Sequence, residues 1–352
     1  MLFGLLFLVG ASLSAPLNLD KVPCQTQDVN LNGPYSLPLT ALADTQFCTY
    51  TFKVPAGQFA FAKVIAYDMN PNGGEGVILN DISEFVQIMG PSSGEDYSKF
   101  NSTLAWPQTF SVNFQSYRNT NMKVQVDITL QKNLLGQNVK STQTTETDGS
   151  SFLVYFQDVQ DGQTFNFNSK SNLVNAKAAL AYSDSWHTLN NIFVYDGGVL
   201  VGTLLTAYTN QNMVTKSKNL QLYVARSVAE LRKGAVLVTD NSNLANSYYH
   251  FVTYVPLDSS DHSMTHLLYG DATRNGALTI IGDKDNSTPY DVRQLVELNG
   301  NTAPFSYILD GPKASDSTKT AINTAKLPAH FGTNVATFYV ASGEATIKYT
   351  LS

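Results

Sequence analysis

The feature that most constrains the fold of this chain is the shortness of its apolar segments. Hydrophobic residues come in alternating or continuous runs of about five to eight, with Gly, Pro, Asn or Asp between them, and helical periodicity is scarce. Short runs separated by turn residues are typical of antiparallel strands in sandwiches or barrels. The stretches "FCTYTFKV" (47–54), "KVQVDITL" (123–130) and "NIFVYDG" (191–197) show this pattern. The sequence therefore predicts an all-β fold of tandem β-sandwich units built from antiparallel strands.

Four segments are expected along the chain. They are a signal peptide at 1–15, a first sandwich at 16–132, a second at 133–233 and a C-terminal β-rich domain at 234–352. The polar stretch 133–150 is interpreted as a linker that opens the second unit, and "LLTAY" (204–208) as a strand. Short helices are expected at 227–233 and 287–298.

Composition narrows the class of protein. Of 352 residues, 43% are hydrophobic, 11% aromatic and only 14% charged, so the chain can bury a core and is not disordered as a whole. Its net charge is −6 and it has no basic cluster, which argues against nucleic acid and acidic lipid as partners.

The N-terminus has the pattern of a signal peptide. An apolar run at 2–9 is followed by small residues, and cleavage is expected after Ser14 or Ala15. The run is too short to span a bilayer, and no later segment has 18 consecutive apolar residues. We therefore expect a secreted, extracellular protein without a membrane span.

The two cysteines, Cys24 and Cys48, fit this compartment. In an oxidising environment a lone pair is most simply one disulfide, which stabilises the fold by roughly 3 kcal/mol for a loop of this length. Two glycosylation motifs begin at Asn101 and Asn286.

The sequence Asp196-Gly197 interrupts an apolar run, and two interpretations compete. Asp and Gly tolerate the positive φ of a tight hairpin, which favours a turn with Ile192 and Val194 on one face of the preceding strand. The alternative is a reactive carboxylate. If the turn is correct, Asp196→Asn should preserve fold and function.

Each of the other candidate sites lacks part of the pattern that its chemistry requires. The stretch "GPSSG" (90–94) fits the nucleophile motif of α/β-hydrolases, but the sequence after it is not helical, so a loop is favoured. His262 and His266 have the spacing of some zinc ligands without an evident third ligand. Trp106 and Trp186 are either core residues or sugar-stacking platforms, and Trp186 has the more polar surroundings.

The region of about 20–132 resembles the CUB domain, and most closely the CUB-like domains of secreted nematode proteins. The resemblance rests on the order of "FCTYTFKVPAGQFAFAKVIAYDM", "SEFVQIMG" and "FSVNFQSYRNTNMKVQVDITL". A looser second copy spans about 150–230, where "FVYDGG" matches the strand and turn.

This resemblance implies an extracellular interaction module that binds protein or glycan surfaces and is not an enzyme, with a role in innate defence against bacteria. Many family members bind calcium through acids at three such places, but here Asn70, Glu84 and Tyr117 stand there. Because calcium prefers several carboxylates, we expect no calcium site. We also expect no catalytic residue and no cofactor, since no phosphate loop, Cys-His cluster or pair of catalytic carboxylates is found with suitable spacing. The alternative function is a secreted hydrolase.

Overall fold

The computed structural model describes most of the chain after the N-terminal segment. The described residues are 21–22, 25–81, 87–90, 99–136, 139–140, 151–169, 173–181, 186–210, 213–228, 231, 233–244, 247–255, 263–271, 273–284, 290–298, 305–313, 315–331 and 333–351. No helix in these ranges is long and apolar enough to cross a membrane.

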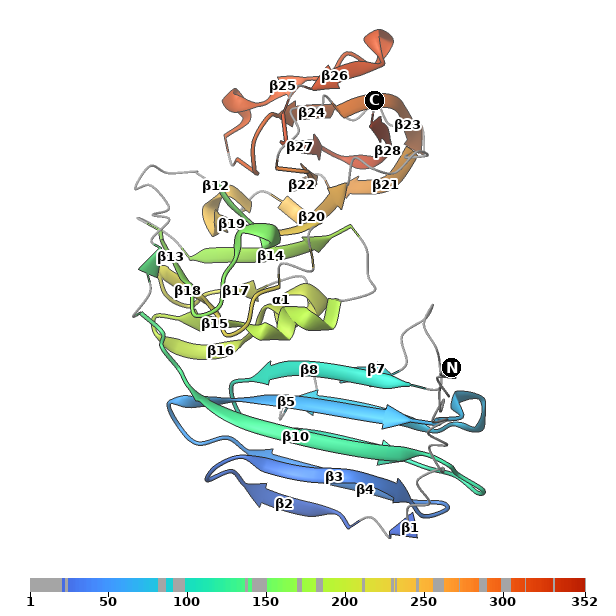
Figure 1. The fold of residues 1–352 in the computed structure, drawn as a ribbon. Helices are drawn as coiled ribbons and strands as arrows, with labels where there is room; N and C mark the ends of the chain where they lie inside the picture. The colour runs from blue at the N-terminus through green and yellow to red at the C-terminus, as the bar shows by residue number, and fades with distance from the viewer. Residues whose placement is uncertain are drawn as a thin grey trace, which may run out of the picture.

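The first sandwich consists of two five-stranded sheets (Figure 1). One has the order β1 (Lys21–Val22), β3 (Tyr35–Leu42), β10 (Lys123–Lys132), β5 (Gln58–Tyr67), β8 (Phe100–Trp106). The other has the order β2 (Gln27–Asn30), β4 (Phe47–Lys53), β9 (Phe110–Gln115), β6 (Gly76–Asp81), β7 (Gln87–Gly90). A short 3₁₀ turn, η1 (Pro71–Gly73), precedes β6.

The second sandwich follows the same plan. One sheet has the order β11 (Val139–Lys140), β13 (Thr164–Asn168), β18 (Asn219–Val224), β15 (Ile192–Asp196), β16 (Val199–Thr203). The other has the order β12 (Ser151–Tyr155), β19 (Gly234–Asp240), β14 (Val174–Leu180), β17 (Met213–Val214). Its helical segments are η2 (Phe156–Asp158), η3 (Trp186–Asn191), α1 (Leu204–Asn210) and η4 (Asn241–Leu244).

The C-terminal domain is a third sandwich. One sheet has the order β20 (Ser247–Val255), β22 (Asn275–Gly282), β27 (Val335–Val340), β24 (Phe305–Ile308), β25 (Thr320–Ala321). The other has the order β21 (Ser263–Gly270), β28 (Gly343–Leu351), β23 (Tyr290–Leu298), β26 (Ala329–Phe331). Two 3₁₀ turns, η5 (Asp316–Thr318) and η6 (Thr324–Lys326), lie between β24 and β26.

The three sandwiches share one topology. One sheet of each sandwich corresponds strand for strand to one sheet of the other two, in the orders β2-β4-β9-β6-β7, β11-β13-β18-β15-β16 and β20-β22-β27-β24-β25. The second sheets correspond as well, as β3-β10-β5-β8, β12-β19-β14-β17 and β21-β28-β23-β26. The parallel pairs β2/β4, β11/β13 and β20/β22 recur at the same place in the three sandwiches, the first sandwich has a further parallel pair, β1/β3, and the other neighbours are antiparallel. The expected all-β sandwich class is confirmed, with these parallel pairs as an addition.

Strand β19 changes one boundary. It pairs with β12 and β14, so it completes the second sandwich as β10 completes the first. The sequence interpretation ended the second unit at residue 233, whereas the pairing extends that unit to Asp240. The boundary was misplaced because strand pairing is non-local and leaves no mark in the order of apolar runs.

Three local predictions differ from the structure. The segment 204–208, expected as a strand, lies in helix α1, where Leu204, Leu205 and Ala207 are buried. Leu and Ala are strong helix formers, which favours this outcome. The helix expected at 287–298 is strand β23 over its described residues, because pairing with β28 outweighs local propensity. Nor are the described residues of 227–233 helical.

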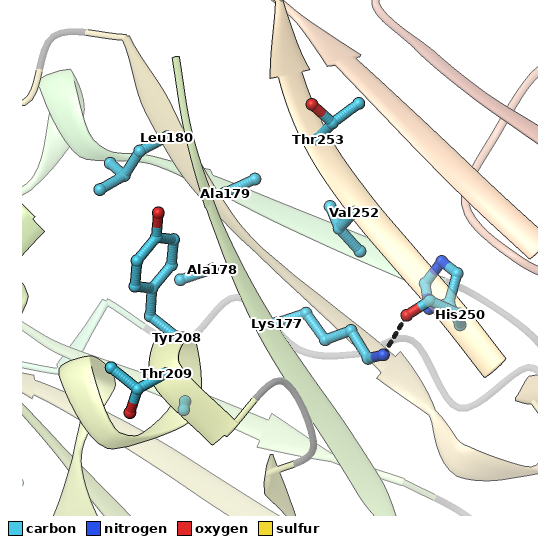
Figure 2. A pocket seen from close by; sticks show the side chains of 10 residues that line it. Lys177, Ala178, Ala179, Leu180, Tyr208, Thr209, His250, Val252 and Thr253 are labelled. Carbon is cyan, nitrogen blue, oxygen red and sulfur yellow. Dashed lines mark hydrogen bonds between the residues drawn. The ribbon is translucent and has the colours of Figure 1, made fainter. Parts of the chain in front are cut away.

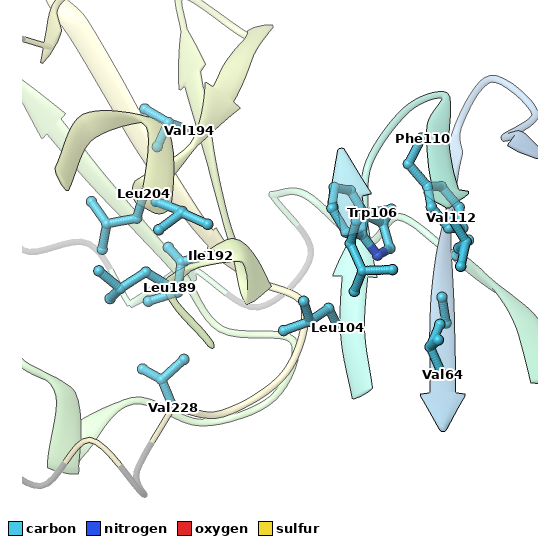
Figure 3. Close-up of a cluster of buried hydrophobic side chains, with 14 of the residues drawn as sticks. Val64, Leu104, Trp106, Phe110, Val112, Leu189, Ile192, Val194, Leu204 and Val228 are labelled. Carbon is cyan, nitrogen blue, oxygen red and sulfur yellow. The ribbon is translucent and has the colours of Figure 1, made fainter. Parts of the chain in front are cut away.

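Buried side chains connect the three units into a stack. The largest cluster crosses from the first sandwich to the second, and Figure 3 shows Leu104 between Trp106 and Leu189. A second cluster joins Phe59 of β5 to Phe193 of β15, with ring centroids 5.5 Å apart. A third joins β14 and β19 to β20 and β22. In each junction the β10-type sheet of one unit faces the β9-type sheet of the next.

Candidate functional site

A pocket of about 380 Å³ lies between the second and third sandwiches. Its lining comes from β14, helix α1 and β20, as Figure 2 shows. The polar groups in this lining are Lys177, Tyr208, Thr209, His250 and Thr253, and the remainder is alanine, leucine and valine.

Lys177 is a buried ammonium group. It lies in β14, where Ala176 and Ala178 face the core of the second sandwich, so alternation directs Lys177 toward the third. Its side chain is 6% exposed and donates a hydrogen bond to the carbonyl oxygen of His250 (Figure 2). Burial lowers the pKa of Lys177 to about 8. Within the described part of the chain, no carboxylate forms an ion pair with it.

The ring of His250 ends a chain of hydrogen bonds. Thr337 donates its hydroxyl hydrogen to the carbonyl oxygen of Asp310 at 2.8 Å. Thr337 Oγ1 therefore accepts from the hydroxyl of Thr279, also at 2.8 Å. Thr279 Oγ1 must then accept from His250 Nε2 at 2.7 Å. Burial, and next the charge of Lys177, lower the pKa of His250 well below its ordinary value, so the ring is neutral. His250 Nδ1 therefore carries a lone pair, and it has no hydrogen-bond partner.

A groove lies beside the edge strand β16. It has a volume of about 350 Å³. Its apolar lining is Val201, Met213 and Val214, and its polar lining is Asp196, Thr206, Thr215 and Lys216. The lining residue Val201 is 47% exposed, and Val199, two residues before it in β16, is 68% exposed. Since β16 is the last strand of its sheet among the described residues, one row of its backbone groups lacks a neighbouring strand.

Asp196 belongs to the turn that precedes this groove. Gly197 and Gly198 have φ values of 57° and 85°, and Asp196 pairs with Val199, so the two glycines form a tight hairpin. The carboxylate accepts hydrogen bonds from the backbone amides of Lys216, at 2.5 Å, and Ser217, at 3.0 Å, and from the Ser217 hydroxyl. Burial raises the pKa of Asp196, but these hydrogen bonds hold it below its ordinary value. The turn interpretation is confirmed.

The predicted disulfide and glycosylation sites are only partly described. Cys48 is buried and is not a free thiol, but Cys24 lies outside the described residues, so their pairing stays a prediction. Asn101 is exposed on the edge strand β8, and its glycosylation stays a prediction. Asn286 lies outside the described residues.

The weak candidates do not assemble into a catalytic site in the described structure. In the stretch 90–94 only Gly90 is described, at the end of β7, and His262 is not described. His266 stacks on Tyr349, with 5.9 Å between ring centroids. The described residues contain no cluster of three His, Cys, Asp or Glu side chains that could hold a metal ion.

The two tryptophans differ. Trp106 is 1% exposed and stacks on Phe110 at 4.9 Å, which confirms it as a core residue. Trp186 is half-buried against the core at the start of η3.

The positions compared with calcium ligands lie in a turn of the first sandwich. Asn70 Oδ1 accepts from the amide of Gly73, and the amide of Asn70 donates to Glu75. Tyr117 lies against the same turn, since a Cβ on Gly74 would meet its ring at 2.8 Å. Glu84 lies outside the described residues. The Asn70 side chain therefore has a structural role in closing this turn.

Sequence reasoning missed Lys177 and His250. The signal for Lys177 was a single lysine inside the apolar run "NAKAALAYS" (175–183), which is unusual for a core strand. No comparable signal marks His250, because its burial depends on the packing of the third sandwich against the second.

The sequence matches no known family model and no curated protein. Among solved structures, the CUB1-EGF-CUB2 domains of rat MASP-1 align with 92% of this chain and 99% of their own, at 7% identity and a TM-score of 0.24. A mutant of a periplasmic inhibitor of g-type lysozyme from Escherichia coli covers 30% of this chain and 99% of its own, at 13% identity and a TM-score of 0.19. A triple jelly-roll protein of an archaeal virus turret covers 94% and 97%, at 6% identity and a TM-score of 0.19. Scores this low carry no argument about function.

Proposed function

We propose that this chain is a secreted, non-catalytic interaction protein that binds an extended segment of a partner protein at the edge strand β16. The observation that carries the proposal is the pair Val199 and Val201, exposed side by side with the groove that Met213 and Val214 line. A soluble protein that groups exposed apolar side chains at one place commonly uses them for binding.

The edge of the sheet explains why the partner is a protein. An extended peptide can add to β16 as a further strand, because the backbone groups on the open side of the edge are those that a neighbouring strand would bind. The valines then supply contacts for alternate side chains of that peptide, and Asp196 and Lys216 offer one charge of each sign in the groove. A glycan would use the backbone edge less well.

The proposal has further parts that rest on the sequence. The N-terminal apolar run supports secretion, the two cysteines support a Cys24–Cys48 disulfide, and the sequons support glycosylation at Asn101 and Asn286. The order of motifs supports membership of the CUB-like family and, with it, a role in defence against bacteria. The repeated sandwich topology supports an architecture of tandem modules.

The alternative function, a secreted hydrolase, requires a nucleophile beside a base. In the described structure the ring of His250 is bonded to Thr279 and the ring of His266 stacks on Tyr349, so neither is placed as the base of the 90–94 motif. We therefore favour binding over catalysis.

The test is a parallel screen of the full secreted chain on arrays of extracellular protein domains and of glycans. The proposal expects a saturable protein ligand whose affinity falls at least about tenfold in the double variant Val199→Ser, Val201→Ser. The matched control is Phe47→Ser, which removes an equally exposed apolar side chain, 68%, from the first sandwich. Binding of glycans alone, or protein binding that the double variant keeps, would contradict the proposed site. Turnover of ester or glycoside substrates would favour the hydrolase.

A further inference from the structure

The two junctions of the stack have the same topology and different chemistry. The first is filled by aromatic side chains, with Phe59, Phe193 and Tyr223 in contact. The second contains apolar Ala179 and Ile281 but also the buried groups Lys177 and His250. The first junction is joined by these rings and by hydrogen bonds between β8 and the side chains of Asn190 and Asn191, so packing of the sandwiches does not require a buried ammonium group.

Burying an ammonium without a counter-charge is unfavourable. Removal of a charge from water costs several kcal/mol unless an opposite charge or several hydrogen bonds compensate for it. Lys177 makes one hydrogen bond, to the His250 carbonyl, so two of its three N–H donors remain for another group. These donors belong to a residue that lines the pocket of about 380 Å³.

We propose that this pocket binds a small hydroxy acid, of the size of a single acidic sugar, whose carboxylate pairs with Lys177. The volume is at the lower end of the range for small-molecule sites. This site is separate from the groove at β16, and the proposal does not depend on partner binding there.

Tyr208 in the lining can bind the hydroxyl groups of the ligand. The ring of His250 does not reach the ligand, because its Nδ1 is buried, and His250 contributes the backbone carbonyl oxygen that accepts from the Lys177 ammonium. Tyr208 keeps its proton because burial raises its pKa, so its hydroxyl is both a donor and an acceptor. A ligand with a carboxylate for Lys177 and hydroxyl groups for Tyr208 matches this lining.

Binding should depend on pH in a way that identifies Lys177. Lys177, His250 and Tyr208 are the titratable residues of the described lining, and the last two are neutral from about pH 7 to 9.5 because burial lowers the pKa of one and raises that of the other. With a pKa of about 8, Lys177 loses its charge in this interval. Affinity for a carboxylate should therefore be roughly thirty-fold weaker at pH 9.5 than at pH 7.

The experiment is calorimetric titration of the full chain with sodium glucuronate, with methyl glucoside as the neutral probe of the same ring size. We expect saturable binding of glucuronate at pH 7, the thirty-fold loss at pH 9.5, and at least tenfold weaker binding of methyl glucoside. Lys177→Met should abolish glucuronate binding while the protein melts at the same temperature or higher, since an uncompensated buried charge is removed.

The matched control is Lys63→Met, in the topologically equivalent strand β5, where the lysine is exposed and binding should not change. Absence of saturable glucuronate binding by the wild-type protein, or unchanged binding by Lys177→Met, overturns the proposal. If Lys177→Met does not fold, the pKa of Lys177 is followed in the wild-type protein by carbon NMR at Cε. Glucuronate must raise that pKa, and an unchanged pKa overturns the proposal as well.

Discussion

Asp196 holds the β15–β16 hairpin against the segment that precedes β18. Its two carboxylate oxygens accept from the amides of Lys216 and Ser217 and from the Ser217 hydroxyl. An amide side chain offers only one acceptor oxygen, so Asp196→Asn should lower the free energy of unfolding by about 1 kcal/mol. This replaces the expectation that the substitution preserves the fold unchanged. Urea unfolding at pH 7 measures the effect, and equal stability of both proteins would show that these hydrogen bonds are unimportant.

The same carboxylate predicts a pH dependence. The pKa of Asp196 in the folded protein is lower than its ordinary value of 3.8, so its contribution to stability is present above about pH 4 and is lost as the pH falls through the folded pKa. The difference in unfolding free energy between wild type and Asp196→Asn should therefore shrink between pH 5 and pH 3. A difference that stays constant over this interval would contradict the assignment.

Gly197 is required by the backbone of the turn. Its φ is +57°, and a Cβ would lie 3.2 Å from Ser217 Oγ. We expect Gly197→Val to lower the unfolding free energy by about 1–3 kcal/mol, because a β-branched residue is strained in this conformation. Gly33→Val is the control, since its Cβ would meet nothing within 4 Å. Equal melting temperatures for the two variants would refute this reading.

Whether Cys24 and Cys48 form a disulfide in the first sandwich can be tested chemically. We expect them to be joined, because Cys48 is buried and is not a free thiol. Mass spectrometry of the unreduced secreted protein should detect one linked peptide containing both residues. Two alkylated thiols without prior reduction would disprove the disulfide and weaken the case for an extracellular protein.

The edge strand β8 is closed by side chains of the second sandwich. The amide of Ala105 donates to Asn191 Oδ1 at 2.7 Å, and its carbonyl oxygen accepts from Asn190 Nδ2 at 2.9 Å. This arrangement satisfies backbone groups that an edge strand would otherwise leave open. Asn191→Ala should cost about 1–3 kcal/mol, because a buried amide loses its acceptor. Asn101→Ala, at an exposed position of the same strand, should change stability by less than about 0.5 kcal/mol, and chemical denaturation of both variants distinguishes these outcomes.

The stack as a whole is held together by contacts between sheet faces. Phe59 and Phe193 meet edge to face, and both are at most 1% exposed. Each change to Ala should cost about 3–5 kcal/mol. The double variant should lose about 0.5–1.5 kcal/mol less than the sum of the single variants, because the aromatic contact is removed by either change. Strict additivity in a double-mutant cycle would mean that the two sandwiches are not coupled through these rings.

The exterior faces of the terminal sheets differ from the faces inside the stack. The outer face of the β4-β9 sheet carries Thr49, Thr51, Ser111 and Asn113, and that of β28 carries Glu344, Thr346 and Lys348. These partly exposed polar side chains alternate with buried apolar ones, as expected for a sheet that has only one face in the core.

The sequence by itself determined the all-β class, the Asp196-Gly197 turn and the inward direction of Ile192 and Val194, because alternation along a strand and positive φ at glycine are local properties. Only the tertiary structure decided that β19 closes the second sandwich, that 290–298 is a strand and that the third unit repeats the first two, since these depend on pairing between distant segments. It also decided the site around Lys177, whose environment is made by β20, about seventy residues later in the chain. A lysine in an apolar strand is visible in the sequence, but its burial, and with it the low pKa, arises only when one sandwich packs on another.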